Sequence, residues 1–248
     1  MDSEKGSKIA KNGFKNEHDV AKKFNHWKVD VDAQKWLKIM GYDLEEIEYV
    51  KAEVVHGYKT DVQVHITIKL IKLIDAQNIQ VKLVSNPKGF NQVDKRWVDK
   101  YVEMWNIPED ISILLKHFTG ELSPYKADVK NSRRMFMNEF TEEEQNKILN
   151  FFKKNKTLIV CDILKGRGKF AAEWILVIQK VDNIRWVLLP INVAINHYGN
   201  ENVEITGRGS LRLGSITMQR KGGDGGRKTA NMLQFKINPA ELFDLIEI

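Results

Sequence analysis

The chain has 248 residues, of which 42% are hydrophobic and 29% charged, with a formal net charge of +6. These values are typical of a globular protein with one large core or two smaller ones, and they exclude a largely disordered chain. The longest apolar runs, WILVI (174–178) and WVLLPI (186–191), fall far short of the roughly 20 residues that span a bilayer. Because the first residues also lack the apolar stretch of a signal peptide, we expect a cytoplasmic protein without a membrane partner. The single cysteine, Cys161, excludes an internal disulfide and a thiolate metal cluster and is expected to be a buried structural thiol.

The positive charge is concentrated in one part of the sequence. Between Ile205 and Lys236 the basic residues stand against a single acid, Asp224, whereas residues 43–48 (DLEEIE) and 139–144 (EFTEEE) are acidic. A basic zone favours a polyanionic partner, most often nucleic acid. On charge alone, a solvated basic surface explains the zone equally well. The basic residues are Arg208, Arg212, Arg220, Lys221, Arg227, Lys228 and Lys236.

Helices are expected before the first strand. They cover residues 13–27, residues 33–40 up to Gly41, and a segment that begins at the capping-box residues Asp43 and Glu46. In the first of them Glu17 falls on the same inward face as Val20 and Phe24, an unusual position for a carboxylate.

Alternating apolar and polar residues predict two strands, over 60–73 (TDVQVHITIKLIKL) and 78–85 (NIQVKLVS), with a turn at 74–78. Asp61 opens the first strand. Gln80 and Lys82 share one face of the second, because side chains alternate along a strand. Helices are then expected over 93–105 and 108–118, after a loop at 86–92.

The second half of the chain is expected to be rich in strands. Its helices are predicted to begin at the Thr141–Glu144 capping box, to cover 191–198, and to follow the cap residue Asn238. The strands are expected near residues 156–164, 172–180, 184–190, 209–220 and 231–237. We therefore predict an α/β (α+β) protein. A region over 1–120 has a mixed central sheet flanked by helices, and a strand-rich region over 121–248 follows a link at about 121–135.

Asp61, Gln80 and Lys82 carry the candidate chemistry. If the two strands pair, a carboxylate, an amide oxygen and an ammonium group converge. Oxygen ligands suit Mg²⁺ and a lysine beside them can orient water, so the trio suits hydrolysis of a phosphodiester with one or two metal ions. A neutral glutamine in place of a second carboxylate would hold the metal more weakly. The simpler alternative is a solvated polar strand face, and the loose spacing alone does not decide between the two.

Several longer stretches resemble a known family. The G-x-x-x-E helix from Gly13 to Glu17, the T-D…Q-V-K strands and the S-N-x-x-G-F-N-Q loop resemble the PD-(D/E)xK nuclease superfamily. Within it they are similar to the type II restriction endonucleases of the HinP type, which cut GCGC and are related to the Msp-type enzyme. RRMFMNEF, ILKGRGKFAAEW and TMQRKGGDGGRKTANMLQFK also look like that group, so the resemblance covers nearly the whole chain. Thr60 departs from the superfamily's proline and Gln80 from its acid, although the HinP-type group also shows the glutamine.

The resemblance implies a Mg²⁺-dependent, sequence-specific type II deoxyribonuclease of a bacterial restriction-modification system. Asp61, Gln80 and Lys82 would take the catalytic roles, with Glu17 as a further ligand or acid. The implied metal ligands are Asp61, Gln80 and the backbone carbonyl of Val81. The implied partners are double-stranded DNA and a cognate DNA methyltransferase that needs no direct contact, and the working unit is left open as a monomer or a dimer.

The loop over residues 86–92 suits contact with DNA. Phe90 is expected to insert between base pairs and to bend the duplex. The alternative is that its ring packs beneath the helix expected at 93–105. The other expected contacts are Asn91 and Gln92 with base edges, and Asn86 and Lys88 with phosphates.

Residues 217–228 (TMQRKGGDGGRK) are the expected recognition segment. Arginine and lysine suit the O6 and N7 acceptors of guanine, and an aspartate can accept from the amino group of cytosine. Gln219, Arg220, Lys221 and Asp224 therefore fit a site of G·C pairs. The GGDGG string lacks the G-K-(S/T) sequence of a P-loop, so ATP-dependent function is not supported. Two other functions stay open: a sequence-specific DNA-binding protein with a weak or inactive site, and a nuclease that selects DNA structure.

Overall fold

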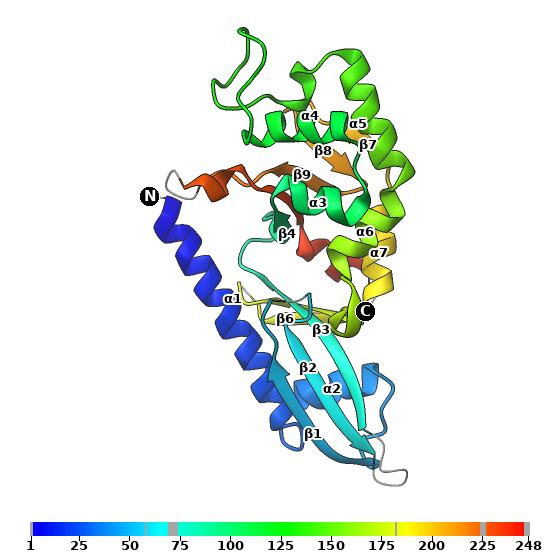
Figure 1. Ribbon diagram of the computed structural model, residues 1–248. Helices are drawn as coiled ribbons and strands as arrows, with labels where there is room; N and C mark the ends of the chain where they lie inside the picture. Colours follow the sequence, from blue (N-terminus) through cyan, green and yellow to red (C-terminus); the bar gives the residue numbers. More distant parts are fainter. Residues whose placement is uncertain (1, 58, 69–73, 182, 224–226, 246–248) are drawn as a thin grey trace. The chain divides into compact units, whose positions relative to one another are not determined.

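The computed structural model describes residues 2–57, 59–68, 74–181, 183–223 and 227–245 (Figure 1). The chain forms two compact units. Unit 1 comprises Met1–Glu4, Phe90–Ile163 and Ile195–Ile237, and unit 2 comprises Lys5–Gly89, Leu164–Ala194 and Asn238–Ile248. In the described part of the chain, no helix combines the length and the apolar composition needed to cross a membrane.

Unit 2 is built on a mixed five-stranded sheet, sheet A, in the order β1-β2-β3-β5-β6. The pairing of β3 with β5 is parallel and the other pairings are antiparallel. The strands are β1 (Ile47–Val54), β2 (Val62–Ile68), β3 (Ile74–Val84), β5 (Trp174–Gln179) and β6 (Arg185–Pro190). The helices are α1 (Asp2–Asn25) and α2 (Val31–Ile39), with the short η2 (Gly168–Phe170) and η5 (Pro239–Leu245).

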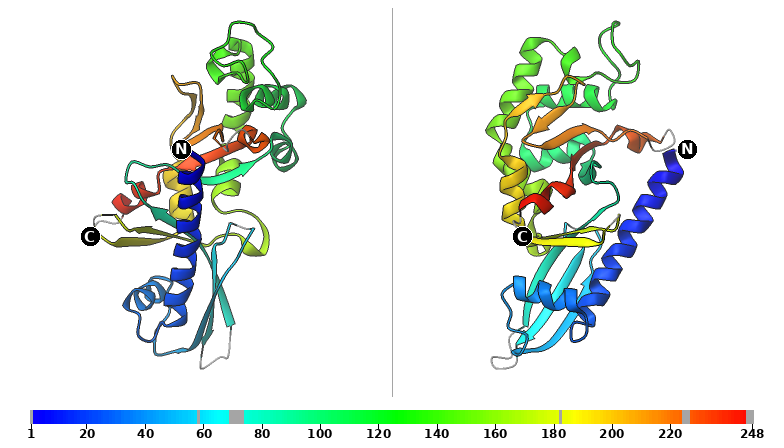
Figure 2. Two further views of the ribbon diagram at one scale, coloured as in Figure 1. Left: turned by 90° about the vertical axis from the view of Figure 1, so that its left-hand side faces the viewer. Right: turned by 180° about the vertical axis from the view of Figure 1, so that it is seen from behind.

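Helices α1 and α2 pack their apolar side chains against sheet A, as the two views in Figure 2 show. Phe24 and Trp36 are fully buried, with ring centroids 5.2 Å apart. The Asp30 side chain accepts from the backbone N–H of Ala33 at the start of α2, and Gly41 follows its end with φ of 93°. The alternating residues Val62, Val64 and Ile66 of β2 are buried in the same core, which leaves the intervening positions of that strand for polar side chains.

Unit 1 contains the second five-stranded sheet, sheet B, in the order β4-β10-β9-β8-β7 with all pairings antiparallel. Its strands are β4 (Asn91–Arg96), β7 (Val203–Ile205), β8 (Leu211–Leu213), β9 (Ile216–Arg220) and β10 (Leu233–Ile237). The helices that lie wholly within it are α3 (Val98–Trp105), α4 (Glu109–Thr119), α5 (Glu142–Lys154), η1 (Met137–Glu139) and η4 (Lys228–Asn231). Helices α6 (Lys156–Leu164) and α7 (Ile191–Gly199) each contribute residues to both units.

An aromatic cluster fills the core between α3 and sheet B. Phe235 of β10 makes edge contacts with Tyr101 and Trp105 of α3, at centroid distances of 5.4 and 5.8 Å. The Tyr101 hydroxyl donates to the buried carboxylate of Asp94 on β4, at 3.0 Å. The face of sheet B that carries Phe235 is therefore the one that α3 covers.

The predicted fold class is confirmed, since a mixed sheet flanked by helices and a strand-rich unit are both present. The Thr141–Glu144 capping box at the start of α5 is also confirmed, as is the helix that ends at Gly120. Asn238 caps the C-terminal segment through its side chain, although that segment is a 3₁₀ helix.

Several local predictions were wrong. Residues 156–164 form α6 and not a strand, because a continuous apolar run fits a buried helix as well as a buried strand. Residues 43–46 form turns before β1, where the Asp43 side chain accepts from the Glu45 N–H in place of a helix cap. The expected turn at 74–78 belongs to β3, and Asn91–Arg96 is strand β4, so the helix expected from 93 begins only at Val98. Cys161 is half-buried rather than buried.

The two units are interleaved along the sequence, whereas a single boundary near 121–135 was expected. The chain passes between them near residues 89–90, 163–164, 194–195 and 237–238, and residues 121–135 lie within unit 1. The division of catalysis and recognition between 1–120 and 121–248 stays a prediction.

Candidate active site

Asp61 is held at the start of β2 by hydrogen bonds to both neighbouring strands. Its backbone N–H donates to Ile79 O of β3 at 2.9 Å, and its carbonyl accepts from the Val55 N–H, just after β1, at 2.9 Å. Its carboxylate oxygen Oδ2 accepts from the backbone N–H of Val81 at 2.6 Å. The aspartate that the sequence placed at a strand end is thereby fixed beside the middle of β3.

Lys82 follows at the next position of β3 and meets the same carboxylate. Its Nζ lies 4.0 Å from Asp61 Oδ2, and the two side chains are only 15% and 20% exposed. An ion pair so far removed from water is screened less than a surface pair. The structure therefore brings Asp61 and Lys82 together as the strand pairing predicted.

Gln80 shares its face of β3 with Lys82 but is not solvated. The residue is 1% exposed, and its amide oxygen Oε1 has no hydrogen-bond partner in the described part of the chain. Its Nε2 donates to Lys59 O over 3.5 Å. Because buried polar atoms are nearly always paired, an acceptor left alone beside a carboxylate is a candidate ligand atom. The alternative of a solvated polar strand face does not describe Gln80.

Glu17 reaches the same electrostatic environment from α1. Burial and the nearby Asp61 carboxylate raise the pKa of Glu17 to about 7, although the Lys82 ammonium opposes the shift. Burial also raises the pKa of Asp61, against the lowering effects of Lys82 and of the Val81 N–H. The inward-facing Glu17 predicted from helical spacing is thus one of two carboxyl groups whose charges interact here.

The available donor atoms fit a magnesium ion. In an extended strand the N–H and C=O of one residue point to the same neighbour, so the Val81 carbonyl lies on the side of Asp61 that its N–H contacts. A carboxylate, an unpaired amide oxygen and a backbone carbonyl form the hard oxygen set that Mg²⁺ accepts together with waters. The described residues contain no group of three or more His, Cys, Asp and Glu suited to a metal, and the set proposed for Mg²⁺ does not depend on one.

Hydrogen bonds anchor a basic loop, residues 165–171, next to Asp61. The buried Thr60 donates through Oγ1 to Phe170 O at 2.8 Å. The Asn78 side chain donates to Lys169 O and Ala171 O at 3.0 and 3.1 Å. Thr60 thus has a structural role at the position of the superfamily's proline, which its departure from that pattern did not reveal.

Sequence reasoning left His56 out of the site. The residue lies close enough to Asp61 for its charge to lower the pKa of that carboxyl, as does Lys59. The ring of His56 also meets Phe14 of α1 edge-on, with centroids 6.2 Å apart. Its place just after β1, the neighbour of the strand that Asp61 opens, was the signal in the sequence that could have included it.

The predicted DNA contacts after β3 form an exposed turn. Asn86 accepts from the Lys88 N–H through its side chain at 3.0 Å and from the Gly89 N–H through its backbone at 2.8 Å. Both Asn86 and Lys88 are exposed. The Phe90 side chain is 48% exposed, so its ring is not packed in the core of unit 1, which was the alternative to contact with DNA.

Polar side chains line one face of sheet B in two rows. Gln92 of β4 pairs with Lys236 of β10, which pairs with Thr217 of β9. In the neighbouring row Lys95 pairs with Gln234, which pairs with Gln219. We call this set the polar face of sheet B: Gln92, Lys95, Thr217, Gln219, Gln234 and Lys236. Gln92 and Gln219, both predicted DNA contacts, thus share one face of one sheet.

The other recognition residues are arranged differently. Arg220 is opposite Leu233, on the face of sheet B that carries Phe235, and its guanidinium donates to Asn231 Oδ1 at 2.7 and 3.2 Å. Lys221 follows the strand, where its N–H donates to Met232 O. Asn91 opens β4 opposite Ile237. Asp224 lies outside the described residues.

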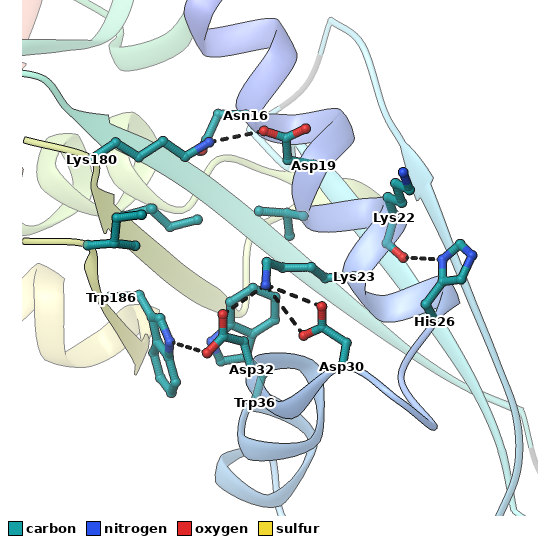
Figure 3. Close-up of a pocket in the computed structure, with 13 residues that line it drawn as sticks. Asn16, Asp19, Lys22, Lys23, His26, Asp30, Asp32, Trp36, Lys180 and Trp186 are labelled. Atoms are coloured by element: carbon teal, nitrogen blue, oxygen red, sulfur yellow. Dashed lines mark hydrogen bonds and ion pairs between the residues drawn. The ribbon is translucent and has the colours of Figure 1, made fainter.

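A separate hollow of about 470 Å³ lies between α1, α2 and the ends of β5 and β6 (Figure 3). Its charged groups are mostly paired with one another: Lys23 with Asp30 and Asp32, and Lys180 with Asp19. Neither Asp61, Gln80, Lys82 nor Glu17 lines it. The hollow is therefore distinct from the candidate active site.

Comparisons with known proteins agree on the type of protein. The R.HinP1I restriction endonuclease family model matches residues 40–243. Among solved structures, the restriction endonuclease MspI in complex with its cognate DNA is similar, with a TM-score of 0.65 over 95% of this chain and 93% of that chain. The two sequences are 15% identical, so this likeness concerns the fold. No curated protein matches the sequence.

Proposed function

Because this chain belongs to the R.HinP1I restriction endonuclease family, we propose that it hydrolyses phosphodiester bonds in double-stranded DNA at a short palindrome of G·C pairs. GCGC is the expected site, through the resemblance of the sequence to the HinP-type group. MspI, whose fold is similar, is in complex with its cognate DNA, which supports duplex DNA as the substrate. A cognate methyltransferase is the expected second enzyme of the same system.

One observation carries the proposed chemistry. Asp61 accepts from the Val81 N–H and lies 4.0 Å from Lys82 Nζ, while the buried oxygen of Gln80 lacks a partner on the same strand. Asp61, Gln80 and the Val81 carbonyl would hold Mg²⁺, and the count of one or two ions is left open. Bound there, Mg²⁺ would polarise the phosphate and lower the pKa of water.

The side chains around these ligands have separate roles in the proposal. Lys82 is placed to orient the attacking water and to offset negative charge that develops on the phosphate. Glu17, with a pKa of about 7, exchanges a proton near neutral pH and can accept one from that water. Hydrolysis joins the water oxygen to phosphorus and breaks one P–O bond to sugar, so that one proton is released to a base.

Digestion of plasmid DNA tests the proposal. Purified protein incubated with plasmid and Mg²⁺ is expected to give discrete fragments, and run-off sequencing of their ends yields the recognition site and the cut position together. EDTA is expected to abolish the fragments. Random degradation, or cleavage confined to branched or damaged DNA, would contradict a sequence-specific enzyme.

A second function is favoured by the neutrality of Gln80. A site with one firm carboxylate ligand holds Mg²⁺ weakly, and a sequence-specific DNA-binding protein with little or no cleavage would share every DNA contact proposed above. The same digestion separates the two functions. A binding protein would shift the mobility of a specific duplex and leave the plasmid intact at any Mg²⁺ concentration.

A further inference from the structure

Lys236 is in the middle of the polar face of sheet B. Strand β10 lies between β4, which carries Gln92, and β9, which carries Gln219. In its own row Lys236 is flanked by Gln92 and Thr217. The side chain therefore lies between the strands that carry two predicted DNA contacts.

The charge of Lys236 is not compensated within the described part of the protein. Its side chain is half-buried, and no carboxylate there forms an ion pair with it. Burial lowers the pKa of Lys236, and no nearby charge offsets that effect. Its partners across the sheet are an amide and a hydroxyl, and the cation Lys95 occupies the next row of β4. An ammonium group that is partly removed from water without a counter-charge is unfavourable until an acceptor-bearing ligand arrives.

We propose that Lys236 reads a guanine in the bound DNA, donating hydrogen bonds to its O6 and N7 atoms, with Gln92 and Gln219 contacting neighbouring base edges. The inference rests on the proposed function, because it takes duplex DNA as the ligand. Strands can enter the major groove, where guanine presents two adjacent acceptors. Glutamine amides on both sides of the lysine suit base edges better than a run of phosphates.

The position of Lys236 on a central strand argues for base reading over a phosphate contact. Its backbone is held from both sides by pairing with β4 and β9, and its half-buried stem restricts the range of the ammonium group. Phosphate contacts by lysine work as flexible, hydrated point charges. A restricted, partly dehydrated donor instead favours an acceptor pair at a defined place.

Selection of duplexes from a randomised pool, in EDTA so that nothing is cleaved, tests the inference. Wild-type protein should enrich a defined site. Lys236→Met should lose the preference for guanine at one base pair of each half-site, with an affinity for the enriched duplex that is lower by about tenfold or more. Binding to an unrelated duplex should change little. Lys236→Arg keeps donors for guanine and should retain the preference.

Thermal unfolding without DNA gives a second readout. Lys236→Met keeps the aliphatic stem and removes a poorly hydrated charge, so its unfolding temperature should be at or above that of the wild type. A structural role would lower it. Lys153→Met on α5 removes the same charge from an exposed position of unit 1 and should leave both the enriched site and the unfolding temperature unchanged.

Other outcomes would overturn the inference. These are an unchanged guanine preference in Lys236→Met, an equal loss of affinity for all duplexes, which indicates a phosphate contact, or a wild-type protein that enriches no site. The proposed function fails separately, if wild-type protein enriches a site but leaves plasmid containing it uncut in Mg²⁺. In that case the assignment of Lys236 as a base-reading residue would still stand.

Discussion

Gln80 combines near-complete burial with an unpaired amide oxygen. A glutamine there avoids the desolvation penalty that a second buried carboxylate would bring near Asp61, whose own pKa burial already raises. The same choice leaves the metal site with one negative charge fewer. Gln80 therefore trades affinity for the metal against stability of the metal-free fold.

Gln80→Glu should reverse that balance. In EDTA we expect the variant to lose about 1–3 kcal/mol of unfolding free energy, because it places an ionisable group in a buried position. Adding Mg²⁺ should raise its unfolding temperature more than that of the wild type. Thermal unfolding as a function of Mg²⁺ concentration measures both effects, with Gln34→Glu on α2 as a control. Identical Mg²⁺ responses of Gln80→Glu and wild type would remove Gln80 from the metal site.

Glu17 gives the metal-free protein a defined pH dependence. Its pKa in the folded state is raised from 4.5 to about 7, so the folded protein binds the proton more tightly than the unfolded chain does. The contribution of Glu17 to stability is then present below the unfolded pKa. It is lost as the pH rises through the folded value, between about 4.5 and 7.

Glu17→Gln should remove this dependence. At pH 8 in EDTA the variant is expected to be more stable than the wild type by about 2 kcal/mol, and at pH 4 the difference should vanish. Chemical denaturation at several pH values measures the difference. A wild type and a variant that differ by the same amount at every pH would show that Glu17 does not titrate between those values.

At the scale of the elements, pairing of β2 with β3 brings the catalytic residues together. The sequence was sufficient to predict that Asp61 approaches Lys82, because strict alternation marked both strands and a short connection made their pairing probable on topological grounds. It was insufficient for α6, whose apolar run has no clear period. It was also insufficient for the loop at 165–171, whose anchors on Thr60 and Asn78 are far away in the sequence.

The Thr60 hydroxyl links that loop to the strand end that carries Asp61. In Thr60→Val the shape is kept but Phe170 O loses its donor, in a position where Thr60 is fully buried. We expect a loss of about 1–2 kcal/mol in unfolding free energy and slower cleavage, because the neighbouring Asp61 is less firmly held. Denaturant unfolding and cleavage assays measure the two effects. Thr157→Val, at an exposed position of α6, is the control, and unchanged stability of Thr60→Val would contradict the role given to this contact.

At the scale of the whole molecule, charge pattern and chain order were unequal guides. The basic residues between Ile205 and Lys236 do fall mainly in one unit, together with sheet B. The composition of the units could not be read from chain order, because the chain passes between them repeatedly. Strands β3 and β5 pair in sheet A although unit 1 contributes most of the residues between them. Such long-range pairing leaves no local trace in a sequence.

The central claim is that Asp61, Gln80 and Lys82 form the catalytic site of a sequence-specific endonuclease. Single-turnover cleavage of a duplex that contains the mapped site, by Lys82→Ala with Mg²⁺ present, tests it most directly. The rate should fall by at least about 10²-fold, while binding of the same duplex in EDTA is retained. Lys51→Ala, at an exposed position of β1, should cleave as the wild type does. Cleavage by Lys82→Ala at the wild-type rate would contradict the claim.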